Sequence, residues 1–152
     1  MGDAKFLLKQ WALDFIKSRD AFFRKIAKID DSSGNFTVSY KDGRQQKNLI
    51  LPNLENAQQA LSSLAQDQHI AIVTLNNKPN RQKLAELWKF LAQYKLLTIY
   101  FANPFSQGEK KWVLIPHIHD KICDAASLIT GFNSLSELVE DISEEEAGAK
   151  AS

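Results

Sequence analysis

The run IAIVTLNNKPN, residues 70–80, decides the expected fold of this chain. Its first six residues, 70–75, are almost entirely apolar and do not alternate, which predicts a strand that is buried on both faces. Such strands occur inside sheets that helices cover on both sides. The run then changes abruptly to Asn76, Asn77 and Lys78. The sequence therefore predicts a central strand with polar side chains gathered at its carboxyl end.

The neighbouring segments predict an order of helices and strands typical of α/β proteins. Apolar residues recur at three- and four-residue steps from Lys5 to Ala27, which predicts a long N-terminal helix with Phe22 and Phe23 in the core. Asp42 and Gly43 predict a type I′ hairpin turn, because both residues tolerate a positive φ. The other expected strands span residues 36–40, 47–51, 69–75, 96–102 and 112–116. Helices are expected over 54–66, capped by Asn53, and over 81–94, capped by Asn80. A further helix is expected from Asp120 to about 128, ended by Gly131, and a last helix is opened by a Ser134–Glu137 capping box and reaches 142.

The order of these elements predicts how the strands pair. The strands over 69–75 and 96–102 enclose one helix, so they are expected to lie side by side and parallel, with a right-handed crossover. The loop after residue 102 is too short for a helical crossover, which makes the strand over 112–116 antiparallel to its predecessor. We therefore predict a three-layer α/β fold, with a mixed central sheet of about five strands, helices on both faces and a long N-terminal helix.

Length, hydropathy and cysteine content limit the class of protein. A chain of 152 residues with 44% hydrophobic residues has the usual size of one domain, so we expect residues 1–142 to form one domain. Residues 143–152 are acidic and small, and are expected to form a disordered tail. No apolar run approaches the roughly 18 residues of a membrane-spanning helix, and lysines interrupt the N-terminus, so the sequence predicts a cytoplasmic protein without a membrane contact. The single Cys123 is compatible with a reducing compartment.

The charges are unevenly distributed, although the net charge is only +1. Residues 134–152 carry one cation and six acids, which conceals a basic body of about +6 over residues 1–133. This surplus favours an anionic partner such as nucleic acid. Phe105, in a polar loop beside two lysines, is a candidate for an exposed stacking contact. The expected nucleic-acid-binding residues are Lys78, Arg81, Lys83, Lys110 and Lys111.

Asparagines predict a pocket at one edge of the sheet. Ligands of open α/β sheets bind beyond the carboxyl ends of parallel strands, where loops and helix N-termini present polar groups. The start of the helix after Asn80 would favour a negatively charged group such as a phosphate. Turn and cap roles are the alternative interpretation of these asparagines. No G-x-G-x-x-G, G-x-x-x-x-G-K-[ST] or G-x-S-x-G motif occurs, so the usual nucleotide loops and the nucleophile elbow are absent. The expected pocket residues are Asn53, Asn76, Asn77, Asn80 and Asn103.

The order of elements, most clearly over residues 70–116, resembles the PD-(D/E)xK or restriction-endonuclease-like superfamily. In that family a strand ends in an acidic residue, any residue and lysine; Asn76-Asn77-Lys78 has this spacing, and Pro52-Asn53 stands where the family has Pro-Asp. The helix expected between the two half-motifs replaces the hairpin usual in the family. The resemblance implies a nuclease-like architecture with a metal site. Because neutral amides hold Mg²⁺ poorly, the two asparagines imply that this site is inactive.

A separate group of possible metal ligands lies in PHIHDKICD, residues 116–124. If the preceding strand continues, His117 and His119 share one face, with Asp120 beside them. Imidazole and carboxylate together suit zinc or iron, and His69 is a possible third ligand. The alternative is ordinary loop chemistry, in which Asp120 caps a helix.

The sequence contains no complete catalytic motif, and no cofactor is indicated. The leading hypothesis is a non-catalytic binding module of nuclease-like architecture that contacts nucleic acid or another macromolecule. One alternative is a metal-dependent hydrolase built around His117, His119 and Asp120. Another is a protein-interaction subunit or homodimer that uses the aromatic N-terminal helix.

Overall fold

The computed structural model describes residues 3–31, 34–122 and 125–151. In chain order its elements are α1 (Ala4–Phe23), β1 (Ile26–Asp30), β2 (Phe36–Tyr40), β3 (Gln45–Ile50), α2 (Ala57–Ser62), β4 (His69–Leu75), α3 (Lys78–Glu86), α4 (Trp88–Leu91), β5 (Leu97–Ala102), β6 (Lys111–Leu114), α5 (Pro116–Ile122), α6 (Ala125–Ser136) and α7 (Glu144–Ala151).

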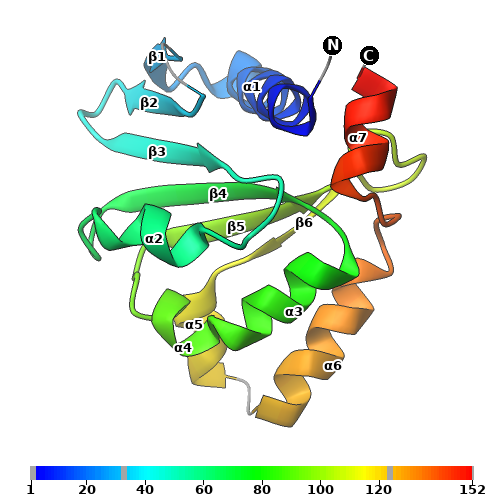
Figure 1. The fold of residues 1–152 in the computed structure, drawn as a ribbon. Helices are drawn as coiled ribbons and strands as arrows, with labels where there is room; N and C mark the ends of the chain where they lie inside the picture. The colour runs from blue at the N-terminus through cyan, green and yellow to red at the C-terminus, as the bar shows by residue number, and fades with distance from the viewer. Residues whose placement is uncertain (1–2, 32–33, 123–124, 152) are drawn as a thin grey trace.

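Six strands form one mixed sheet in the order β1-β2-β3-β4-β5-β6 (Figure 1). β1, β2 and β3 are antiparallel neighbours, β3, β4 and β5 are parallel, and β6 is antiparallel to β5. The predicted α/β class is confirmed, and so is the parallel pairing of β4 with β5. The sheet has one strand more than the sequence indicates, because β1 adds an edge to it.

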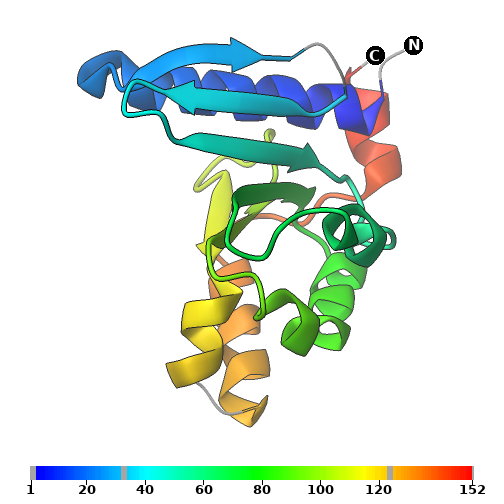
Figure 2. The same cartoon turned by 90° about the vertical axis from the view of Figure 1, so that its left-hand side faces the viewer.

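Helices cover both faces of the sheet. α1 and α7 lie on one face, and α2 to α6 lie on the other (Figure 2). Side chains of β4 enter both cores: Ile70 and Ile72 pack with α2 to α4, whereas Val73 and Leu75 pack with α1. β4 is therefore buried on both faces, as its uninterrupted apolar run predicts.

The N-terminal helix ends earlier than predicted. Arg24 takes the left-handed conformation with φ of 52°, and its N–H donates to the carbonyl oxygen of Asp20 at 2.7 Å. The Asp20 carboxylate accepts hydrogen bonds from the N–H groups of Lys25 at 2.7 Å and Ile26 at 3.2 Å. This closure ends α1 and directs the chain into β1. The predicted continuation to Ala27 is therefore wrong.

The β2–β3 hairpin is confirmed, but its turn is of another type. Among the described residues, Arg24 is the only non-glycine with positive φ, so Asp42 does not take the conformation that a type I′ turn needs. Gly43 has φ of 91°, and its N–H donates to the Tyr40 carbonyl at 3.0 Å. The loop therefore has three residues, with the glycine supplying the left-handed position.

The helices after β3 and β4 also begin at other residues. α2 is shorter than predicted, and Asn53 does not cap it. α3 begins before Arg81, because the side chain of Asn77 caps it by accepting a hydrogen bond from the N–H of Asn80 at 3.0 Å. The expected cap, Asn80, is buried instead. The predicted single helix is interrupted at Leu87, with φ of −94° and ψ of 5°, before α4.

Two helices replace the one predicted after β6. α5 begins at Pro116, so Asp120 lies inside a helix rather than at its cap. α6 continues through Gly131, where the sequence predicts its end. The continuation buries Phe132, whose ring packs edge to face against Trp88 with centroids 5.2 Å apart. Tertiary packing therefore outweighs the weak helix propensity of the glycine.

The C-terminal residues form a helix where the sequence predicts a disordered tail. The predicted capping box at Ser134 and Glu137 does not open a helix, because α6 already spans Ser134. Ser143 and Glu146 form the capping box instead: the Glu146 N–H donates to Ser143 Oγ at 3.1 Å, and the Ser143 N–H donates to Glu146 Oε1 at 3.3 Å. Ala147 is fully buried in the core that α1 forms with the sheet. Docking on α1 therefore supplies the apolar contacts that this segment lacks by itself.

Candidate functional site

The five asparagines of the predicted pocket gather at the carboxyl edge of β4 and β5. Asn76 is fully buried there, and both ends of its side-chain amide are bonded. Its Nδ2 donates to the carbonyl oxygen of Val139 at 2.9 Å, and its Oδ1 accepts from the indole Nε1 of Trp112 at 2.8 Å. The Ile142 N–H donates to the Asn76 backbone carbonyl at 2.9 Å. Asn76 therefore joins β4 to β6 and to the segment before α7.

Asn77 and Asn80 continue this network. Asn77 Nδ2 donates to the carbonyl oxygen of Ile142 at 3.0 Å, while its Oδ1 caps α3. Asn80 Oδ1 accepts from the N–H of Leu54 at 3.1 Å, and its Nδ2 donates to the carbonyl oxygen of Leu75 at 2.8 Å. The amide of Asn80 thus connects the end of β4 with the loop that follows β3.

The remaining two asparagines of the set bond to the same C-terminal segment. Asn103 Nδ2 donates to the carbonyl oxygen of Glu140 at 3.0 Å, and the exposed Asn53 donates to the Glu144 carboxylate at 2.9 Å. Residues 136–142 thus occupy the edge where a ligand was expected. The side chains of these asparagines form hydrogen bonds that join separate segments of the chain. Their role as a ligand pocket stays a prediction.

Two of the predicted nucleic-acid-binding cations are paired with acids. Arg81 makes a bidentate ion pair with Asp141, at 2.9 Å and 3.2 Å. Lys83 Nζ lies 3.5 Å from a carboxylate oxygen of Glu86 and 4.0 Å from one of Glu55. Pairing leaves these two side chains less positive charge to offer a phosphate.

The other predicted cations lie in different places. Lys78 is exposed at the start of α3, on the face opposite to α1. Lys110 Nζ donates to the carbonyl oxygen of Ser106 within its own loop at 2.8 Å, and Lys111 packs against α1. Phe105, the expected stacking residue, is half-buried under Lys150. The predicted cations therefore do not form one surface, and their role in binding stays a prediction.

The histidines of the expected metal site lie in α5, not on a strand. Two residues apart on a helix are separated by about 200°, so His117 and His119 point in different directions. His117 Nδ1 lies 2.9 Å from the carbonyl oxygen of Ala92, and the Asp120 carboxylate accepts from Trp88 Nε1 at 2.9 Å. Within residues 3–31, 34–122 and 125–151, no group of three or more His, Cys, Asp or Glu side chains is placed to hold a metal ion.

The remaining members of this expected group have other surroundings. Lys89 also donates to the Asp120 carboxylate, at 2.9 Å. The bonds from Lys89 and Trp88 hold the pKa of Asp120 below its ordinary value of 3.8. Cys123 and Asp124 lie outside the described residues.

The half-motifs of the nuclease-like resemblance lie at one edge of the sheet but in different environments. Asn76 is buried, whereas Asn53 and Lys78 are exposed. The carboxylate beside Asn76 belongs to Asp141, whose Oδ1 accepts from Asn76 Nδ2 at 3.2 Å. That carboxylate is also the partner of Arg81. The resemblance itself stays a prediction.

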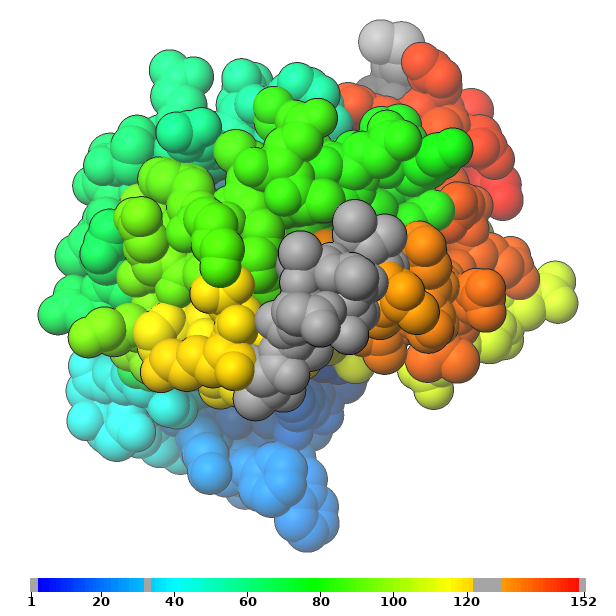
Figure 3. Space-filling model, turned by 90° about the horizontal axis from the view of Figure 1, so that it is seen from below, coloured from blue at the N-terminus to red at the C-terminus, as the bar shows by residue number. Residues whose placement is uncertain are grey.

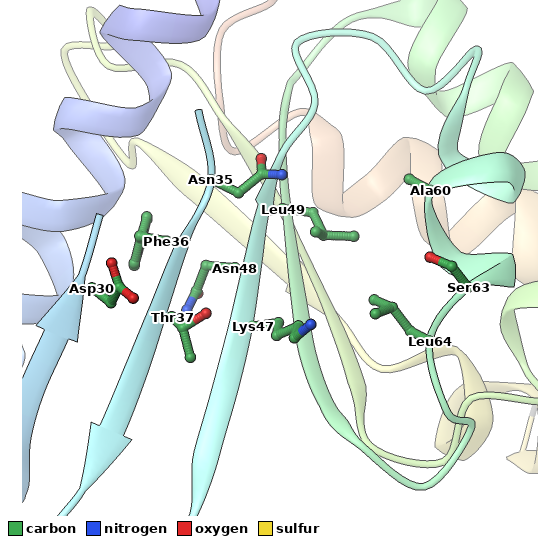
Figure 4. A pocket seen from close by; sticks show the side chains of 10 residues that line it. All are labelled: Asp30, Asn35, Phe36, Thr37, Lys47, Asn48, Leu49, Ala60, Ser63 and Leu64. Carbon is green, nitrogen blue, oxygen red and sulfur yellow. The ribbon is translucent and has the colours of Figure 1, made fainter. Parts of the chain in front are cut away.

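A cleft of about 380 Å³ lies between β1 to β3 and the segment from Ala60 to Leu64, which includes the end of α2 (Figure 4). Strand pairing places Asp30, Thr37 and Lys47 in one row across β1, β2 and β3. Antiparallel sheets commonly expose such polar rows to water. The row explains why the cleft is polar, and it contains none of the residues that the sequence singles out.

A different surface runs along α1 to the β2–β3 hairpin, and of its cations the sequence indicates only Lys111. On it, cationic groups lie over aromatic rings: Arg19 over Phe15 at 5.2 Å, Lys111 over the same ring at 4.9 Å, Lys25 over Phe23 at 5.5 Å and Arg44 over Tyr40 at 4.6 Å from the ring centre. We call these seven residues the α1 stripe.

The α1 stripe is continuous although its residues are far apart in sequence. Arg19, Lys25 and Arg44 line one cavity of about 200 Å³ with Phe23 and Tyr40. The end of α1 and the hairpin lie at the same end of the molecule (Figure 2). Viewed from below, the blue residues of this end project beyond the rest of the surface (Figure 3).

Among the described residues, no cation of the α1 stripe lies within salt-bridge distance of an acid. In the part of the chain that the structure describes, the salt bridges all involve Arg81, Lys83 or Lys89, none of which belongs to the stripe. Two acids also lie in this region: Asp20 accepts from the N–H groups of Lys25 and Ile26, and Asp42 accepts from the N–H of Arg44 at 2.9 Å. Both carboxylates line cavities together with cations of the stripe. The four cations of the stripe outnumber these two acids, so a surplus of positive charge lies beside the aromatic rings.

No protein-family model, curated protein or solved structure matches this chain. Among the helices of the described residues, none has the length and apolar character needed to cross a membrane. The proposals that follow therefore depend on the residues and geometry of this chain.

Proposed function

We propose that this protein is a non-catalytic binding module that holds nucleic acid on the α1 stripe. The supporting observation is that cations without a salt-bridge partner among the described residues alternate with aromatic rings over α1, the β2–β3 hairpin and β6. A nucleic acid offers two matching features, a row of phosphates and a series of flat bases. Cations and rings on one surface can engage both features at once.

The electrostatic part of this proposal follows from the distribution of ion pairs. A cation that already contacts a carboxylate must give up that contact before it gains a phosphate, which reduces the net gain. Arg81 and Lys83 are in this situation, whereas Arg19 and Arg44 form no salt bridge within the part of the chain that the structure describes. We therefore place phosphate contacts on the stripe rather than on α3.

The proposal that the module is non-catalytic rests on the residues at the carboxyl edge of β4. Asn76 and Asn53 stand where the nuclease-like resemblance would require acids. Phosphodiester cleavage by that family's chemistry needs anionic oxygens to hold a divalent cation, and amides are poor substitutes. The Asn76 amide is also bonded to Trp112 and Val139, so it has little freedom to turn toward a metal.

The test measures binding of a fluorescently labelled oligonucleotide to the full chain by anisotropy over a series of salt concentrations. Replacing Arg19 and Arg44 together, as Arg19→Glu and Arg44→Glu, should weaken binding. It should also reduce the slope of log K against log salt by about 1.4 to 1.8, the value for two lost phosphate contacts. Lys95→Glu is the matched control, because Lys95 is an exposed cation outside the stripe; it should leave the slope nearly unchanged.

A further variant, Lys78→Glu, compares the stripe with the cations that the sequence indicates. If Lys78→Glu weakens binding more than the double stripe variant does, the interface lies at α3 and the proposal is wrong. Equal and small effects of all three changes would also contradict it, because the stripe would then have no special role.

A further inference from the structure

Two exposed aromatic rings stand at the end of the α1 stripe. Phe22 is 86% exposed and Phe23 is 62% exposed, so the prediction that both rings lie in the core is wrong. Large apolar rings are normally buried. The two rings contact each other edge to face with centroids 5.2 Å apart. Both belong to the last turn of α1, so a regular helix holds them at the surface.

Cations surround this ring pair. Lys25 Nζ lies 5.5 Å from the centre of the Phe23 ring, and Arg24 follows directly in the left-handed conformation that ends the helix. Lys25 and Arg44 also line the adjoining cavity of about 420 Å³. A strand that follows these cations would carry its bases past the two rings.

We infer, resting on the proposed function, that the nucleic acid is single-stranded and that Phe22 and Phe23 stack on its unpaired bases. Unpaired bases expose their flat faces to an aromatic side chain, and such stacking tolerates any sequence. In a duplex the same faces are already stacked on neighbouring bases, so a surface ring can reach them only after the duplex is distorted.

A membrane surface is the other partner that exposed aromatics beside cations can favour. The α1 stripe supports nucleic acid over a membrane, because its alternation of charge and ring continues from the projecting end of α1 to Phe15 and Lys111 beside β6. Shallow insertion into a bilayer would use only the projecting end. A flexible strand can follow the whole stripe.

The test measures Kd of the full chain for three labelled probes of equal length: a homothymidine strand, an abasic strand and a DNA duplex. The variant carries Phe22→Ala and Phe23→Ala, and the matched control is Phe6→Ala, since Phe6 is 59% exposed near the other end of the same helix. The double variant should weaken homothymidine binding roughly five- to a hundredfold. Its binding to the abasic strand and to the duplex should be unchanged, and Phe6→Ala should have no effect on any probe.

The outcomes separate this inference from the proposed function. If the double alanine variant binds homothymidine as the parent does, or loses affinity for the abasic strand equally, base stacking is overturned. The charge-reversal variant at Arg19 and Arg44 then decides whether nucleic-acid binding itself stands. If no oligonucleotide binds, and vesicles of anionic phospholipid bind in a manner that needs Phe22 and Phe23, the surface contacts membranes and both proposals fail. Circular dichroism and thermal unfolding confirm that each variant is folded, which the exposure of both rings leads us to expect.

Discussion

The carboxyl edge of β4 and the α1 stripe use polar groups in opposite ways. At the carboxyl edge the amide of Asn76 bonds to Trp112 and Val139, and the Arg81 guanidinium is paired with Asp141. On the α1 stripe Arg44 lies over an aromatic ring and has no acidic partner among the described residues. Polar groups that gather at a sheet edge can therefore serve the fold alone, whereas cations left unpaired remain available to a partner.

The largest expected loss of stability comes from removing the hydrogen bonds of Asn76 at the carboxyl edge. Asn76→Ala should lower the free energy of unfolding by about 3 kcal/mol, because it leaves the Trp112 indole N–H and the Val139 carbonyl without partners in the core. Urea unfolding followed by tryptophan fluorescence measures this change.

The matched change on the stripe should behave differently. Arg44→Glu is expected to alter the free energy of unfolding by less than about 1 kcal/mol, since it removes one exposed cation–aromatic contact. If Asn76→Ala and Arg44→Glu lowered the free energy of unfolding equally, the main role of the stripe would be structural.

A loss of stability smaller than that of Asn76→Ala tests whether the C-terminal segment closes the edge. Ala147 is fully buried, so Ala147→Arg should cost about 2 kcal/mol by overpacking and by burying a charge. Ala149 is exposed on the same helix, and Ala149→Arg should change stability by less than about 0.5 kcal/mol. Thermal unfolding of the two variants compares them directly. If both changes are neutral, residues 144–151 are the disordered tail that the sequence predicts.

A pH-dependent change in stability tests a paired cation, Lys89, through its partner Asp120. Hydrogen bonds from Lys89 and then Trp88 hold the pKa of Asp120 below its ordinary value of 3.8. Because the folded state lowers this pKa, the stabilisation is fully present above pH 3.8 and is lost as the pH falls through the lower, folded value. Asp120→Asn should therefore reduce stability at neutral pH and reduce its loss in acid. Urea unfolding across this pH range measures both, and a parallel shift of the whole curve would contradict the assignment.

The sequence predicts the middle of the fold well because that region depends on strong local signals. The apolar run of β4 reproduces the strand from His69 to Leu75, and the helix between two such runs predicts their parallel pairing. The gathering of the asparagines follows from the same topology, since the carboxyl ends of parallel strands meet at one edge. Their partners do not follow from it, because the carbonyls of residues 136–142 come from a distant part of the chain.

The sequence alone thus determines the α/β class, the buried central strand and the edge where the asparagines collect, since short-range periodicity encodes all three. The tertiary structure decides which polar groups remain available to a partner. It leaves Phe22 and Phe23 at the surface and brings Lys111 against α1. Local spacing already places Arg19 beside Phe15 and Arg44 beside Tyr40. Contacts between distant segments bring Lys111 to Phe15 and pair Arg81 with Asp141, and no local pattern specifies those contacts.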